Sequence, residues 1–226
     1  MSLTTIMAIE KNVSYAEQAY TELKRLIIFC ELPAETILNE RDVSKRLGIS
    51  RTPVRDALQM LETKGWLERR GKNKIVSPIT EKNIREIFEL RKVLERLTVD
   101  LAKDKITKRD LDYYNYLITQ FEDVRDKAIS CTQDPSVSII EILELDKTFH
   151  LYMGKICGND MLYNTMDELF EQFVRIHITT FHDIFSRMDF LVAGHRKMNE
   201  CLQNHNFEAY KELISAHFTS WPNSWV

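Results

Sequence analysis

Apolar residues in the first third of the chain recur every three or four positions in three short segments, which is the spacing of an amphipathic helix. The segments cover residues 14–32, 39–47 and 50–64, and each begins with Ser or Asn, side chains that cap helix N-termini. Gly48 separates the second segment from the third, and Gly65 follows the third. Two short helices joined by a few residues that include glycine are typical of a helix-turn-helix.

The third segment has two chemically different faces. Three apolar residues at helical spacing form the face that we expect to be buried: Val54, Leu58 and Leu61. The opposite face carries side chains that can bond phosphates and base edges: Arg51, Thr52, Arg55 and Gln59. Two strands are expected next, at residues 66–69 and 74–77, joined by a basic hairpin tip at residues 71–73. These elements predict a winged helix-turn-helix.

The remaining two thirds of the chain show helical spacing and no alternating strand pattern. Six helices are expected, at residues 80–105, 107–130, 139–157, 161–181, 187–203 and 207–220. Short connections between them favour an antiparallel bundle. The predicted fold class is therefore mostly α, with a winged helix-turn-helix at residues 12–78 and an all-helical unit at residues 79–226.

The helix expected at residues 80–105 has an apolar stripe that contains one arginine. Six residues of this stripe are expected to face inward: Ile84, Ile87, Phe88, Leu94, Leu97 and Leu101. Arg91 projects into the same stripe, and a buried guanidinium needs an anion beside it. The sequence allows two such anions, namely Glu95 one turn further along the helix or the carboxylate of a bound ligand.

Composition limits the class of protein. Of the 226 residues, 44% are hydrophobic and 29% are charged, which fits a globular protein. Glycine and proline number only 6 and 5, so few tight turns can form and long helices are favoured. No apolar run approaches the roughly 18 residues that span a bilayer, and no signal-peptide pattern is present. The four cysteines are isolated and are expected to be reduced thiols in a cytoplasmic protein.

Charge is distributed unevenly along the chain. The formal net charge is −3, yet residues 1–80 carry +3 and the remaining residues carry −6. Residues 41–74 contain 10 basic and 4 acidic side chains, a net charge of +6. A basic segment within an acidic protein is typical of a part that binds a polyanion such as double-stranded DNA.

Aspartate and histidine residues of the helical part form a candidate metal site. Asp146 and His150 are four residues apart and therefore project from one face of a helix. His195 and His217 lie 11 residues on either side of Asn206, so in an antiparallel hairpin both rings lie at the same height, about 16 Å from the turn. One Asp and three His converging on a bundle core predict a divalent transition metal, with zinc first and nickel or manganese as alternatives.

A distinctive run of residues spans the predicted turn and the third helix. It comprises Leu38-Asn39-Glu40-Arg41, then Leu47-Gly48-Ile49-Ser50-Arg51-Thr52-Pro53-Val54-Arg55-Asp56-Ala57-Leu58, then Leu61-Glu62 and Gly65-Trp66-Leu67. This part of the chain resembles the GntR family of bacterial transcription regulators, although the family usually has a glycine near Cys30. The resemblance implies that six positions contact DNA: Arg41, Ser50, Arg51, Thr52, Arg55 and, at the wing tip, Gly71.

A second set of matching residues is spread over the helical part. It comprises Glu89-Leu90-Arg91 with Glu95, Asp146-x-x-Phe149-His150, Gly158-Asn159-x-x-Leu162, Arg175, Gly194-His195 and Ala216-His217. This set resembles the ligand-binding domain called FCD, which occurs in the FadR branch of the same family. The resemblance implies that the Asp and three His hold a metal with open coordination positions. A small organic acid is then expected at these positions, in contact with Arg91 and Arg175.

Together these features predict a ligand-responsive transcription regulator rather than an enzyme. We expect a repressor that binds a palindromic operator as a homodimer and responds to a small carboxylate. The link at residues 77–79 is the expected place for the DNA-binding heads to rotate. Three alternatives stay open at this point: a metal-free sensor of acyl thioesters, a metal-dependent hydrolase fused to a DNA-binding head, and a structural DNA-binding protein without an effector.

Overall fold

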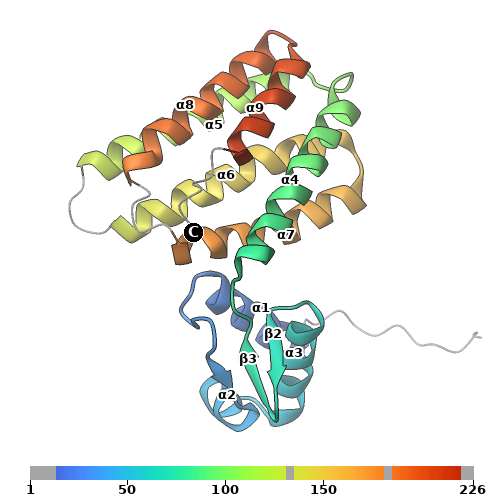
Figure 1. The fold of residues 1–226 in the computed structure, drawn as a ribbon, viewed down its shortest axis with the longest axis vertical. Helices are drawn as coiled ribbons and strands as arrows, with labels where there is room; N and C mark the ends of the chain where they lie inside the picture. The colour runs from blue at the N-terminus through green and yellow to red at the C-terminus, as the bar shows by residue number, and fades with distance from the viewer. Residues whose placement is uncertain (1–13, 131–134, 181–184, 220–226) are drawn as a thin grey trace, which may run out of the picture. The chain divides into compact units, whose positions relative to one another are not determined.

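A computed structural model describes residues 14–130, 135–180 and 185–219 of the chain. The chain divides into two compact units, and the division lies between Pro78 and Ile79. In the described residues the first unit combines three helices with a small sheet, whereas the second unit contains six helices (Figure 1). The predicted fold class, mostly α with a winged helix-turn-helix followed by a helical bundle, is confirmed.

The helices of the first unit lie close to the predicted segments: α1 (Tyr15–Ile28), α2 (Glu40–Leu47) and α3 (Arg51–Thr63). Ser14 caps α1, because its hydroxyl accepts a hydrogen bond from the Glu17 N–H while the Glu17 carboxylate accepts one from the Ser14 N–H. Both α1 and α2 pack against α3. The predicted inward face of α3 is buried, together with the apolar face of α1: Val54, Leu58, Leu61, Leu23 and Ile27.

A three-stranded antiparallel sheet completes the first unit (Figure 1). Its hairpin consists of β2 (Leu67–Arg70) and β3 (Asn73–Val76), with Arg70 opposite Asn73. The hairpin turn places Gly71 at a φ of +63°, in the left-handed region that glycine enters without a Cβ penalty. The hydrophobic pattern did not predict β1 (Ile37–Leu38), which pairs with β3 on its other side. Two residues are too few for an alternating pattern to be visible.

Three of the four cysteines lie within the described residues as free thiols, and Cys131 lies outside them. Cys30 is the second residue after α1 and has a φ of +57°. A side chain at a positive φ is strained relative to glycine. The backbone therefore explains why a glycine near this position suits the turn better than the cysteine found here.

The second unit contains α4 (Glu81–Ala102), α5 (Lys108–Ser130), α6 (Pro135–Cys157), α7 (Asp160–Thr180), α8 (Phe185–Gln203) and α9 (Phe207–Thr219). Helix α6 begins four residues before the predicted start, at a proline, a residue compatible with the first turn of a helix. Helix α4 contacts α6, α7 and α9, while α5 contacts α6 and α8 (Figure 1). Each of the described helices is too short or too polar to cross a bilayer.

The buried face of α4 differs from the predicted one. Its buried residues are Phe88, Arg91, Glu95, Thr98, Val99 and Ala102. Leu97 and Leu101, which we expected to face inward, are 42% and 39% exposed. The apolar periodicity of α4 misled the prediction because the second partner of Glu95, His150, lies on α6, and the sequence of α4 does not contain that information.

Aromatic side chains fill the interior of the second unit. Five of them are completely buried: Tyr114, Phe121, Phe149, Phe170 and Tyr210. Edge-to-face contacts link Phe149 to Tyr114 and Phe121, with ring centroids 5.0 and 6.2 Å apart. Burial of each ring contributes on the order of 1.5–3 kcal/mol. Three of the rings, those of Phe121, Phe149 and Phe170, contact histidine side chains at the centre of the bundle.

Candidate metal centre and DNA-binding face

Four side chains from three helices converge inside the second unit. Asp146 and His150 lie on α6, His195 on α8 and His217 on α9. One ligand atom from each of the four lies within 4.8 Å of every other. The structure therefore brings together the four residues of the predicted metal site.

The spacing of these atoms suits coordination of a single ion. His195 Nε2 lies 3.2 Å from Asp146 Oδ1 and 3.3 Å from His150 Nε2. Nε2 of His150 and Nε2 of His217 lie 3.7 and 3.9 Å from the same carboxylate oxygen. Two ligands that are each about 2.1 Å from one ion lie about 3.0–3.4 Å apart, so the observed separations need only small adjustments.

Burial supports the same interpretation. Asp146, His150 and His195 are each at most 2% exposed, and the His217 side chain is 14% exposed. Neither carboxylate oxygen of Asp146 accepts a hydrogen bond of good geometry from the described residues. A buried carboxylate without such donors is costly, and a cation shared with three imidazoles would compensate its charge. The donor set and these carboxylate oxygens fit a divalent transition metal.

The backbone and two aromatic rings fix the orientation of His195. Its Nδ1 lies 2.8 Å from the Leu191 carbonyl oxygen, which can only accept, so Nδ1 carries the proton. Nε2 therefore presents its lone pair to the rest of the group. The ring stacks on Phe121 at 4.4 Å and meets Phe149 edge to face at 4.7 Å. A ring held on three sides cannot easily turn away from the group.

The protonation states of the group also suit a metal. Burial, reinforced by His195, lowers the pKa of His217 well below its ordinary value, so this ring is neutral at pH 7. Burial raises the pKa of Asp146, but the contact with His195 and the proximity of the other imidazoles outweigh burial and hold that pKa below its usual range. At neutral pH the group therefore offers an ionised carboxylate and an unprotonated His217.

The lowered pKa of His217 predicts a pH-dependent stability of the metal-free protein. Below about pH 6.5 the unfolded chain protonates His217 while the folded chain does not, so the free energy of unfolding falls as the pH falls. We expect His217→Gln to reduce this slope by up to about 1.4 kcal/mol per pH unit. Urea unfolding of chelator-treated protein between pH 7 and pH 5 measures this dependence of the free energy of unfolding on pH. His205→Asn, at an exposed turn residue, is the control, and identical slopes in His217→Gln and wild type would contradict the prediction.

Arg91 pairs with the protein's own carboxylate. Its Nε and one terminal nitrogen lie 3.0 and 2.9 Å from Glu95 Oε1, and its guanidinium lies over Phe170 and Phe173 at 3.7 and 3.9 Å. Of the two anions that the sequence allowed, Glu95 is the one in place. The other predicted effector contact, Arg175, is on α7 and is only 3% exposed, so it is not a solvent-facing charge.

The six residues predicted to contact DNA are all exposed on the first unit: Arg41, Ser50, Arg51, Thr52, Arg55 and Gly71. Ser50 occupies the N-cap position of α3, but its hydroxyl makes no capping hydrogen bond, contrary to prediction. The third helical position is Pro53, which has no N–H to donate. The Ser50 hydroxyl is therefore available to a partner outside the helix, and α3 begins with N–H groups that favour an anion.

Ion pairs within the protein determine which other basic residues of this unit are available to contact DNA. Arg70 is held by Glu35 at 2.7 Å and by Glu68 at 3.0 Å. Lys74 pairs with Glu62 at 2.8 Å and donates to the side-chain oxygen of Gln59 at 3.3 Å, so the predicted DNA-facing Gln59 already has a partner.

Three exposed basic residues have no ion pair among the described residues: Lys45 and Arg46, which were not singled out from the sequence, and Lys72 of the predicted hairpin tip. The sequence shows that these residues lie in the basic segment, but it does not show that neighbouring basic residues are held in ion pairs.

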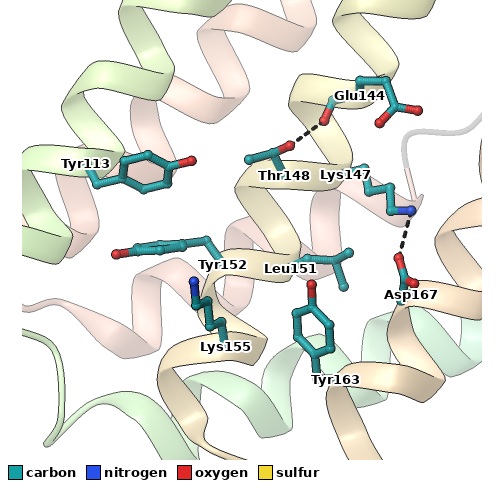
Figure 2. Close-up of a pocket in the computed structure, with 9 residues that line it drawn as sticks. All are labelled: Tyr113, Glu144, Lys147, Thr148, Leu151, Tyr152, Lys155, Tyr163 and Asp167. Atoms are coloured by element: carbon teal, nitrogen blue, oxygen red, sulfur yellow. Dashed lines mark hydrogen bonds and ion pairs between the residues drawn. The ribbon is translucent and has the colours of Figure 1, made fainter. Parts of the chain in front are cut away.

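A separate cavity of about 320 Å³ opens beside α6 (Figure 2). Figure 2 shows Lys147 reaching Asp167, 2.7 Å away, with Tyr113, Tyr152 and Tyr163 around the hollow. The α6 residues that line it lie on the face of the helix opposite to the metal-site residues. The cavity and the metal site share no residue, so its side chains provide controls that do not touch the group.

Comparisons with known proteins identify both units. Residues 15–76 match the family described as bacterial regulatory proteins, gntR family, and residues 86–220 match the FCD domain. The HTH-type transcriptional regulator YdhC of Bacillus subtilis (strain 168) is 29% identical over 214 residues, covering 93% of this chain and 90% of that protein. The HTH-type transcriptional repressor RspR of Escherichia coli (strain K12) is 26% identical over 202 residues, covering 89% of this chain and 84% of that protein.

A solved structure has the same fold. The Escherichia coli protein McbR/YncC superimposes with a TM-score of 0.71 at 19% identity, covering 92% of this chain and 95% of that one. The matched families and relatives are transcriptional regulators, not enzymes. The chain therefore belongs to the gntR family of bacterial regulatory proteins, carries an FCD domain as its helical unit, and is a transcriptional regulator.

Proposed function

We propose that this regulator is a repressor whose affinity for a DNA operator is controlled by a small organic acid bound at a divalent metal in the FCD domain. The observation that carries the proposal is the group Asp146, His150, His195 and His217, with its ligand atoms within 4.8 Å of one another in the interior of the bundle. The repressor RspR supports the sign of regulation by analogy. The hydrolase alternative is set aside because the matched families are regulators.

Each residue of this site would have its own role in binding the metal or the effector. Asp146 supplies the anionic ligand, and the three imidazoles supply neutral nitrogen ligands. When bound, the metal offers positive charge and further coordination positions for a carboxylate. Arg175, buried on α7, is the proposed second contact for that carboxylate. Contact of the effector with Arg91 would require exchange with Glu95.

The DNA-binding face would act through α3. Arg51 and Arg55 are one helical turn apart on its exposed side, where each can reach a base edge or a phosphate. The Ser50 and Thr52 hydroxyls and the N–H groups at the start of α3 suit the phosphate backbone. Arg41 and the hairpin tip at Gly71 add contacts at either side of this helix, with Lys72 supplying charge beside the glycine.

We further propose that the chain acts as a homodimer through the exposed face of α4. Four apolar side chains at spacings of three and four residues are more than a third exposed there: Leu90 at 52%, Val93 at 64%, Leu97 at 42% and Leu101 at 39%. A continuous apolar stripe of this kind is typical of a protein interface. A two-fold axis through the pair would match the symmetry of a palindromic operator with half-sites about one helical turn apart.

A double substitution tests this interface. We expect Val93→Glu with Leu97→Glu to convert a dimer into a monomer, because burying two carboxylates against a second copy is costly. Light scattering coupled to size-exclusion chromatography measures the mass. Tyr116→Glu changes an apolar residue that is 55% exposed on α5 and should leave the dimer intact. A dimeric double variant would show that the interface lies elsewhere.

Ligand-induced release from DNA tests the function as a whole. An operator is first selected from random DNA with the wild-type protein. Its affinity is then measured with chelator-treated and zinc-loaded protein, in the presence of a series of small mono- and dicarboxylic acids. We expect at least one acid to weaken operator binding only in the zinc-loaded protein, and operator to weaken binding of that acid by the same factor. Acids that act equally without metal would favour the metal-free sensor instead.

A further inference from the structure

A buried carboxylate on α4, that of Glu95, lies between Arg91 and the metal group. Glu95 is 2% exposed, and its two oxygens have different partners. Oε2 lies 2.7 Å from Nδ1 of His150 on α6, while Oε1 lies 3.0 Å from Nε of Arg91 on its own helix. A single carboxylate therefore joins α4 to one of the four candidate metal ligands.

The contact determines which nitrogen of His150 carries a proton. Oε2 accepts no hydrogen bond of good geometry from the described residues, but at 2.7 Å a lone pair on Nδ1 would repel the ionised carboxylate, so the proton of His150 is on Nδ1. The lone pair is then on Nε2, the nitrogen that faces His195 Nε2 at 3.3 Å and Asp146 Oδ1 at 3.7 Å. With the opposite tautomer, a hydrogen would occupy the position that an ion needs. His195 is oriented in the same way by the Leu191 carbonyl oxygen, 2.8 Å from its Nδ1.

Arg91 holds Glu95 in the ionised state and in place. Its side chain is completely buried and lies over the rings of Phe170 and Phe173, so it has little freedom to move. A guanidinium remains charged under all physiological conditions and compensates the buried carboxylate. Because Arg91 engages Oε1, Oε2 stays available to His150.

We propose that Glu95 is a positioning residue that fixes the tautomer and orientation of His150 for metal binding, and that Arg91 anchors Glu95 rather than contacting the effector. The inference rests on the proposed function, in which this group binds a metal. Partners of this kind, outside the ligand set itself, typically change metal affinity by about 10–100-fold. The same contact ties α6 to α4, the helix that directly follows the link to the DNA-binding unit.

Glu95→Gln tests the inference with almost no change in shape. A glutamine offers one acceptor oxygen where the carboxylate offers two, so it satisfies Arg91 or His150 but not both. We expect the full-length, chelator-treated variant to bind Zn²⁺ about 10–100-fold more weakly than wild type in a competition titration with a metal-binding dye. Glu89→Gln makes the same change at an exposed position of α4 and should keep the wild-type affinity.

The outcomes separate this inference from the proposed function. If wild type binds no Zn²⁺, the metal-dependent function fails. If wild type binds Zn²⁺ and Glu95→Gln matches it within twofold, the positioning role is wrong and the metal site stands. Should Glu95→Gln not fold, as judged by circular dichroism, NMR of the histidine nitrogens in zinc-loaded wild type decides. Zinc on Nε2 of His150 with a proton on Nδ1 supports the inference, and zinc on Nδ1 overturns it.

Discussion

His195→Ala is expected to abolish stoichiometric metal binding. His195 has the shortest separations in the group, with its Nε2 3.2 Å from Asp146 Oδ1 and 3.3 Å from His150 Nε2. Removal of the His195 ring leaves three ligands and a space beside the apolar rings of Phe121 and Phe149. Elemental analysis of the purified variant and of wild type gives metal atoms per chain. We expect close to one in wild type and close to none in the variant.

The His195→Ala substitution should leave DNA binding by the first unit unchanged. His195 belongs to the second unit, whereas the basic face lies on the first. Affinity for non-specific DNA at one fixed salt concentration should therefore equal that of wild type. His205→Asn removes a histidine from an exposed turn and should retain the metal. An unchanged metal content in His195→Ala would show that the four residues are not the ligand set.

Arg51→Ala is expected to weaken operator binding by about 1–3 kcal/mol and to relax base preference at one position of each half-site. Arg51 is the first residue of α3 and is exposed, and no ion pair holds it among the described residues. Its guanidinium can therefore make two parallel hydrogen bonds to a guanine without first breaking a bond within the protein. Quantitative binding to the selected operator and to its single-base variants measures both effects.

Arg25→Ala controls for loss of positive charge in the same unit. Arg25 is on α1 and pairs with Glu22 at 3.0 Å and with Glu31 at 2.7 Å. Its removal should change operator affinity little and leave base preference intact. If Arg51→Ala weakens binding equally on every sequence, Arg51 contacts a phosphate and does not read a base. The salt dependence of binding would then decrease by about one counterion.

Local sequence signals predicted the first unit well. Gly48 takes a φ of +68° at the end of α2, and Gly71 takes +63° in the hairpin. A position that requires a positive φ selects glycine, so both breaks are visible in the sequence. The Ser50 cap failed for an equally local reason, since Pro53 cannot donate.

The second unit was predictable where one helix or one hairpin contains the relevant spacing. Asp146 and His150 share a face because they are four residues apart. The rings of His195 and His217 lie 5.4 Å apart in the structure, on the two helices that flank the turn around Asn206. Helical spacing did not predict the buried face of α4, because Leu97 and Leu101 face solvent there.

The sequence by itself determined the helices, the helix-turn-helix and the identity of the four candidate ligands, because periodicity, caps and spacing act over a few residues. Only the tertiary structure decided which face of α4 is buried, that Glu95 lies against His150, and that Arg70 is held by Glu35. The reason is physical: these charged side chains have partners that lie far away along the chain, so no local pattern contains the contact. Glu95 and His150 are 55 residues apart, and only the packing of α4 against α6 brings them within 2.7 Å.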